Sequence, residues 1–143
     1  MYYNWQEPKK LDYVRFNKPS PNLVEICEWL LKRWGGTKIG IFNKRPVRGG
    51  TAPSSHSFGA ALDWRYRLRK DAEEAMKMIV RSHSKLGVQV IIDYYGCRQW
   101  MPKSGWKPLT PNKVKGFGEP WAKWIHIETT KEAWGDKTPI ESR

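Results

Sequence analysis

Two histidines and one aspartate stand at positions from which they could hold a metal ion. His56 lies in a turn-like segment, Asp63 follows it in an expected strand, and His126 lies in a second expected strand far along the chain. Two imidazoles and a carboxylate are a common ligand set of catalytic zinc sites, which keep a fourth position for water. Such a centre is suited to polarising both a carbonyl and a bound water. We therefore expect one Zn²⁺ ion, held by His56, Asp63 and His126.

The residues between the first two ligands support this expectation. Gly59 allows the backbone to fold tightly between His56 and Asp63, and Ala61 allows another element to approach closely. Side chains alternate along a strand, so Ala61 and Asp63 share one face, and His126 shares a face with Glu128. Aspartate is disfavoured in strands, so we expect Asp63 to have a partner that compensates for its position there.

Each histidine also has a simpler interpretation. Taken alone, His56 is typical of a histidine in a surface loop, and His126, between two isoleucines, is typical of a hydrogen-bonded core histidine. His83 stands near the end of an expected helix, beside serines. We expect His83 to face the solvent and not to bind the metal.

The segment around the first two ligands matches a known signature. Ser54, His56, Gly59, Ala61 and Asp63 fit the pattern Ser-x-His-x-x-Gly-x-Ala-x-Asp. This pattern resembles that of the D-alanyl-D-alanine carboxypeptidase and L-alanyl-D-glutamate endopeptidase family of zinc peptidases, whose fold is shared with the hedgehog signalling domain. The resemblance covers roughly residues 40–130. It implies that His56 and Asp63 bind zinc and that His126, in a later strand, completes the ligand set.

The chain departs from this family where the general base is expected. A zinc peptidase needs a group that takes a proton from water, and the relatives carry an acid three residues before the last histidine or a histidine two before it. Lys123 and Trp124 occupy these positions. We favour Glu119 as the base and Glu128 as a residue that orients a ligand imidazole. A loop charge at Glu119 and a solvated strand end at Glu128 remain open alternatives.

The resemblance also implies an arginine upstream of the first ligand, which steadies the substrate carbonyl or carboxylate. Arg45 and Arg48 are the candidates, although they stand close to His56 in the sequence. An arginine there would suit a developing oxyanion. The alternative is that both residues only contribute charge to a basic loop.

The expected elements give an α+β protein with a small mixed or antiparallel sheet and two main helices, and the resemblance implies a fold like that of hedgehog and the DD-peptidases. We expect a single domain over 1–143, with a core at 22–130 between an N-terminal arm and a C-terminal tail. The apolar patterns predict helices from 22 to 34 and from 71 to 83, strands at 37–42, 60–66, 88–95 and 124–129, and a long loop at 96–123.

The charge restricts the partners without selecting one. The chain carries 26 Lys and Arg against 14 Asp and Glu, a formal net charge of +12, which favours binding to polyanions. Nucleic acid, an anionic cell-wall polymer and a membrane surface all fit this charge. Cys27 and Cys97 do not form a disulfide framework, and we expect both to be reduced.

The leading hypothesis is a zinc-dependent peptidase that acts on peptidoglycan stem peptides, of the kind bacteriophages encode as endolysins. It would cleave a peptide bond next to a D-residue. One alternative is a catalytically degenerate zinc module that binds the cell wall or a protein partner. Another is a basic nucleic-acid-binding protein. The first residues lack the apolar run of a signal peptide, so we expect synthesis in the cytoplasm and action on the wall after release, or as a virion component.

Overall fold

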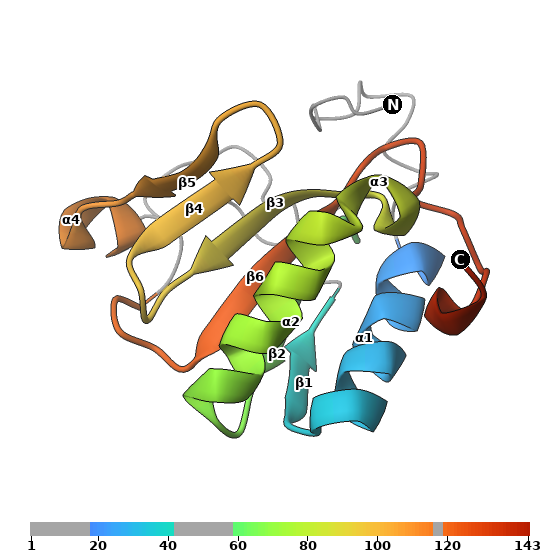
Figure 1. Ribbon diagram of the computed structural model, residues 1–143, viewed down its shortest axis with the longest axis horizontal. Coiled ribbons are helices and arrows are strands. Elements are labelled where there is room, and N and C mark those ends of the chain that lie inside the picture. The colour runs from blue at the N-terminus through green and yellow to red at the C-terminus, as the bar shows by residue number, and fades with distance from the viewer. Residues whose placement is uncertain (1–17, 42–58, 116–118) are drawn as a thin grey trace.

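The computed structural model describes residues 18–41, 59–115 and 119–143. Within these ranges the chain forms an α+β fold with one antiparallel sheet, which confirms the predicted class (Figure 1). The strands are β1 (Thr37–Gly40), β2 (Ala61–Arg65), β3 (Val88–Asp93), β4 (Arg98–Met101), β5 (Gly105–Pro108) and β6 (Trp124–Thr129). The helices are α1 (Pro21–Trp34), α2 (Arg69–Arg81), α3 (His83–Leu86) and α4 (Pro111–Lys115), with a 3₁₀ turn, η2 (Ile140–Ser142), near the C-terminus.

The six strands lie in the order β1-β2-β6-β3-β4-β5, and every neighbouring pair is antiparallel. The late strand β6 therefore inserts between β2 and β3 at the centre of the sheet. This insertion places β2, which carries Asp63, directly beside β6, which carries His126. A central strand flanked on both sides is also held by two ladders of hydrogen bonds, so its side chains are well positioned.

Helix α1 begins one residue before its predicted start at 22 and ends at the predicted residue, Trp34. The Ser20 side chain accepts a hydrogen bond from the Leu23 N–H, and Pro21 occupies the first turn, where its missing N–H costs nothing. Gly35 ends the helix with a positive φ of 73°. Helices α1 and α2 have 14 and 13 residues, and no helix in the described ranges is long and apolar enough to cross a membrane.

Helix α2 begins earlier than predicted. Its first residue is Arg69, and Leu68 precedes it without a side-chain capping bond. Asp71, the predicted first residue of the helix, lies in its first turn, where a negative charge interacts favourably with the positive end of the helix dipole. The helix ends at Arg81, and the short helix α3 follows after Ser82.

The predicted long loop at 96–123 is wrong for much of its length. It contains strands β4 and β5, which pair as a hairpin, and the short helix α4. Trp100 of β4 is buried in the main core. These strands were not predicted because each has only four residues, which is too short for a clear alternating pattern. The hairpin extends the sheet beyond β3 and is visible on the left of Figure 1.

The two faces of the sheet have different environments. On one face, buried side chains of β2, β3 and β6 pack against α1 and α2 and form the main core. Each large apolar side chain buried there contributes roughly 1.5–3 kcal/mol to stability. On the other face, a smaller cluster contains Val90, Ile92 and Tyr94 together with Val114 of α4. Because side chains alternate, the neighbours of the core residues in β2 and β6 point away from α1 and α2.

Candidate metal centre

Asp63 and His126 face each other across the central ladder of the sheet. Asp63 of β2 pairs directly with His126 of β6, and Ala61 pairs with Glu128 two residues further along. Leu62 and Ile127, which alternate with these residues, belong to the main core. The acidic side chains and the imidazole therefore project from the sheet face opposite α1 and α2.

The His126 ring lies between two carboxylates. Its Nδ1 is 3.1 Å from Oδ1 of Asp63, and its Nε2 is 2.8 Å from Oε2 of Glu128. His126 is 6% exposed, and the side chains of Asp63 and Glu128 are 15% and 16% exposed. On the other side of β6, Ile92 pairs with His126, so the ring has an apolar neighbour in β3. The group is thus largely desolvated, and its charges interact strongly.

This environment sets the protonation state of the metal-free histidine. Burial disfavours the charged ring, but the hydrogen bonds and negative charges of Asp63 and Glu128 outweigh it and raise the pKa of His126 to about 10. An imidazolium donates from both nitrogens, which suits one carboxylate on each side. A metal ion that binds one of these nitrogens must therefore displace a proton.

The chemistry of these groups fits a zinc centre on the Asp63 side of the ring. Two ligand atoms bound to the same tetrahedral zinc ion lie roughly 3.4 Å apart, close to the separation between Nδ1 of His126 and Oδ1 of Asp63. Nε2 then remains bonded to Glu128, an arrangement in which a carboxylate orients a ligand histidine. Within the described ranges, no group of three or more His, Cys, Asp or Glu side chains is arranged so that it could hold a metal ion. Asp63 and Glu128 contact opposite nitrogens of the His126 ring, so they do not converge on one point. His56, the expected third ligand, lies outside the described residues.

The backbone leading into β2 is fixed at Gly59. This residue has a φ of +67°, and a Cβ atom there would overlap the carbonyl oxygen of Lys18. The Gly59 carbonyl accepts a hydrogen bond from the Ser20 N–H at 3.0 Å, which ties this turn to the start of α1. The Ala60 carbonyl accepts from Thr129 N–H at 3.0 Å, which ties it to β6. Any side chain at position 59 would displace the entry to the strand that carries Asp63.

The expected catalytic groups fall in different places. Glu128 contacts His126 directly. Glu119 is exposed in the turn before β6, and none of the hydrogen bonds between described residues joins it to His126. Lys123 is also exposed, and the Trp124 ring packs against Tyr94 with 5.8 Å between ring centroids. Arg45 and Arg48 lie outside the described residues.

The expectation that His83 faces the solvent is wrong. Its ring is half-buried, with Nδ1 2.9 Å from the Val80 carbonyl oxygen, and it meets the Trp100 ring edge-on at 5.2 Å. Amphipathic rings of this kind cover apolar surface while keeping a polar contact. Both cysteines are free, and Cys27 is buried in α1, where burial raises the pKa of its thiol to about 11.

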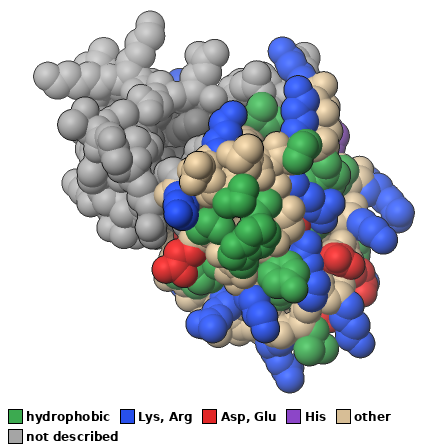
Figure 2. Space-filling view, turned by 90° about the vertical axis from the view of Figure 1, so that its left-hand side faces the viewer, with side chains coloured by type: hydrophobic (Ala, Val, Ile, Leu, Met, Phe, Trp, Pro, Cys, Tyr) green, Lys and Arg blue, Asp and Glu red, His purple; other side chains and the backbone are tan. Residues whose placement is uncertain are grey.

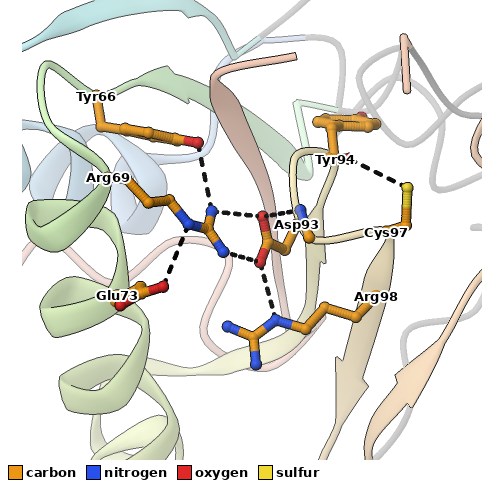
Figure 3. A network of polar contacts seen from close by, with 8 residues as sticks. Tyr66, Arg69, Glu73, Asp93, Tyr94, Cys97 and Arg98 are labelled. Atoms are coloured by element: carbon orange, nitrogen blue, oxygen red, sulfur yellow. Dashed lines mark hydrogen bonds and ion pairs between the residues drawn. The ribbon is translucent and has the colours of Figure 1, made fainter. Parts of the chain in front are cut away.

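A second polar cluster, which was not predicted from the sequence, lies on the helix side of the sheet. Asp93 is fully buried at the end of β3 and accepts two hydrogen bonds from Arg69, at 2.8 and 2.7 Å, and one from Nε of Arg98 at 2.8 Å (Figure 3). Burial would raise the pKa of Asp93, but these bonds and one from the Gly96 N–H hold it below its usual value. A carboxylate that ends an apolar strand was a signal that a cationic partner was needed.

Comparison with known proteins places the chain in no family. It matches no protein-family model, no curated protein and no solved structure.

Proposed function

We propose that this protein is a zinc-dependent peptidase that acts on peptidoglycan stem peptides, with a fold like that of hedgehog and the DD-peptidases. The observation that carries the proposal is the pairing of Asp63 with His126 across β2 and β6. The spacing from His56 to Asp63 and the position of Gly59 support it. A peptidase of this kind fits the strongly positive charge of the chain, because bacterial cell walls carry anionic polymers.

Asp63 and His126 would hold the ion together with His56. A metal ion held there would polarise a peptide carbonyl and activate a water molecule for attack on it. Glu128 would fix the His126 ring through Nε2, so that Nδ1 stays directed toward Asp63. The sheet itself contributes rigidity, since Asp63 and His126 lie on adjacent strands and not on loops.

We propose Glu119 as the general base, acting from the turn that precedes β6. Its substitution distinguishes this role from that of a ligand. In Glu119→Gln the zinc content should remain that of the wild type, while the turnover number falls by a factor of about 100 or more. Wild-type turnover in this variant would exclude Glu119 as the base.

The second candidate is a zinc module without hydrolytic activity that binds the cell wall. It is favoured by the exposed Lys123 and the packed Trp124, which stand where relatives of the resembled family carry the base. The same zinc centre would then hold β2 and β6 together, and the cationic surface would supply the affinity for the wall.

Digestion of purified cell walls tests the proposal. The zinc-loaded protein should release new amine termini, and a chelator should abolish the release until zinc is restored. His126→Ala should be inactive, whereas His83→Ala, which replaces a histidine on the helix side, should keep the activity. Full zinc occupancy without new amine termini would select the inactive module. Undiminished release by His126→Ala would overturn both candidates.

A further inference from the structure

Arg98 presents the donor end of its guanidinium at the surface, on the sheet face opposite the candidate metal centre. Its Nε donates to Oδ2 of the buried Asp93 at 2.8 Å, and its guanidinium carbon lies 3.9 Å from the centre of the Trp106 ring. The side chain is 34% exposed. Its two terminal nitrogens have no hydrogen-bond acceptor within the described ranges (Figure 3). The group is therefore held along one edge and one face, with its terminal N–H groups left for another molecule.

Asp93 cannot neutralise both of its arginines. Arg69 takes both carboxylate oxygens and also contacts Tyr66 and Glu73, so its donors are occupied within the protein. Arg98 shares one of the same oxygens through Nε alone. Two guanidinium charges thus meet one buried carboxylate. Arg98 therefore has only a share of the Asp93 carboxylate as its anionic partner, and Glu73, with a side chain 54% exposed, pairs with Arg69 and not with Arg98.

A rigid guanidinium with two free NH₂ groups is suited to an oxyanion. Two parallel donors match two oxygens of a phosphate or carboxylate, and a group fixed in advance loses little conformational entropy on binding. Figure 2 views the side of the molecule that carries α4 and the β4–β5 hairpin and shows many Lys and Arg side chains around a group of hydrophobic ones. With a net charge of +12, the protein attracts a polymer of oxyanions more strongly than a single ion.

We propose that Arg98 is a binding site for the phosphate groups of a polyol-phosphate polymer of the cell wall. The phosphate site itself is independent of the metal centre, while the choice of a wall polymer rests on the proposed function. The neighbouring rings favour this polymer over a single-stranded nucleic acid. Trp106 and Tyr95 each carry an arginine on one face, from Arg98 at 3.9 Å and from Arg69 at 5.1 Å, which leaves less aromatic surface for stacked bases.

The test compares two arginines that each lie over a tryptophan ring but differ in their carboxylate partner. Arg33 also lies over a tryptophan, with its guanidinium carbon 5.0 Å from the centre of the Trp34 ring, but its partner Glu74 is an exposed residue at 3.9 Å. Calorimetric binding of purified poly(glycerol phosphate) should weaken about tenfold in Arg98→Gln and less than about twofold in Arg33→Gln. Equal losses in the two variants would show that only net charge matters and would overturn the site.

Three further measurements test the conclusion. Arg98→Lys keeps the charge and a donor for Asp93 but loses the paired N–H groups, so it should fold and still bind the polymer several-fold more weakly. Wild-type affinity in Arg98→Lys would contradict the proposal. If binding of an oligothymidylate weakens in Arg98→Gln while binding of poly(glycerol phosphate) does not, the partner is a nucleic acid and the proposal is overturned. His126→Ala should bind the polymer like the wild type, which separates failure of this site from failure of the metal centre.

Discussion

Nδ1 of His126 lies 3.1 Å from Oδ1 of Asp63, and the two residues are direct partners in the antiparallel ladder of β2 and β6. The backbone of two adjacent strands thus sets their separation, and no loop has to close to bring them together. On the opposite edge of the ring, Glu128 holds Nε2 at 2.8 Å. A histidine held on both edges has one orientation, which is what a metal ligand requires.

Glu128→Gln tests whether this second contact supports metal binding. The amide can still accept a hydrogen bond from Nε2, but the negative charge that favours a positively charged centre is lost. We expect zinc affinity to fall by a factor of about 10–100, with the protein still folded. Competition with a chromophoric chelator measures the change. Glu132→Gln, at a residue in the segment after β6, should leave the affinity unaltered, and equal effects in the two variants would rule out a specific role for Glu128.

The metal-free protein should lose stability as the pH rises above neutrality. The pKa of His126 is raised from an ordinary value of 6.5 to about 10 in the folded state, so the folded protein holds a proton that the unfolded chain releases. The resulting stabilisation is fully present below pH 6.5 and is lost as the pH rises to about 10. Thermal unfolding of the metal-free protein across this range measures the effect. His126→Gln should show a flatter profile, and an unchanged slope would contradict the assignment.

Substitution of Asp93 should affect stability and not metal binding. Asp93→Asn leaves two guanidinium groups beside a neutral amide in a buried position, and removal of one partner from such a cluster costs about 3–5 kcal/mol. Denaturant unfolding gives the change in free energy, and zinc titration should give the wild-type affinity. The depressed pKa of Asp93 also means that its contribution is present above an ordinary aspartate pKa and is lost as the pH falls through the folded-state value. A variant as stable as the wild type would show that the cluster does not hold β3 and β4.

The sequence predicted the centre of the fold better than its edge. The strand at 124–129 was predicted with the bounds of β6, because its alternating pattern is that of a strand with one face in the core. Gly59 was predicted to allow a tight turn, and its positive φ and the nearby Lys18 carbonyl give the physical reason. Both signals are local, so a single sequence contains them.

The features that sequence analysis missed depend on contacts between distant segments. Strands β4 and β5 have four residues each and become regular only because β3 offers an edge for pairing. The cluster of Arg69, Asp93 and Arg98 joins the start of α2 to the β3–β4 turn. The spacing of these residues in the sequence does not predict that they meet. His83 was assigned to the solvent because its partner, Trp100, lies in a strand that was not expected.

Zinc titration of the metal-free protein is the most direct test of the account. We expect one zinc ion per chain in the wild type and in His83→Ala, and a loss of affinity of at least about 100-fold in both Asp63→Ala and His126→Ala. Circular dichroism of each metal-free variant shows whether the fold is kept. Stoichiometric zinc binding with wild-type affinity in folded Asp63→Ala and His126→Ala would contradict the central claim that these two residues form a metal centre.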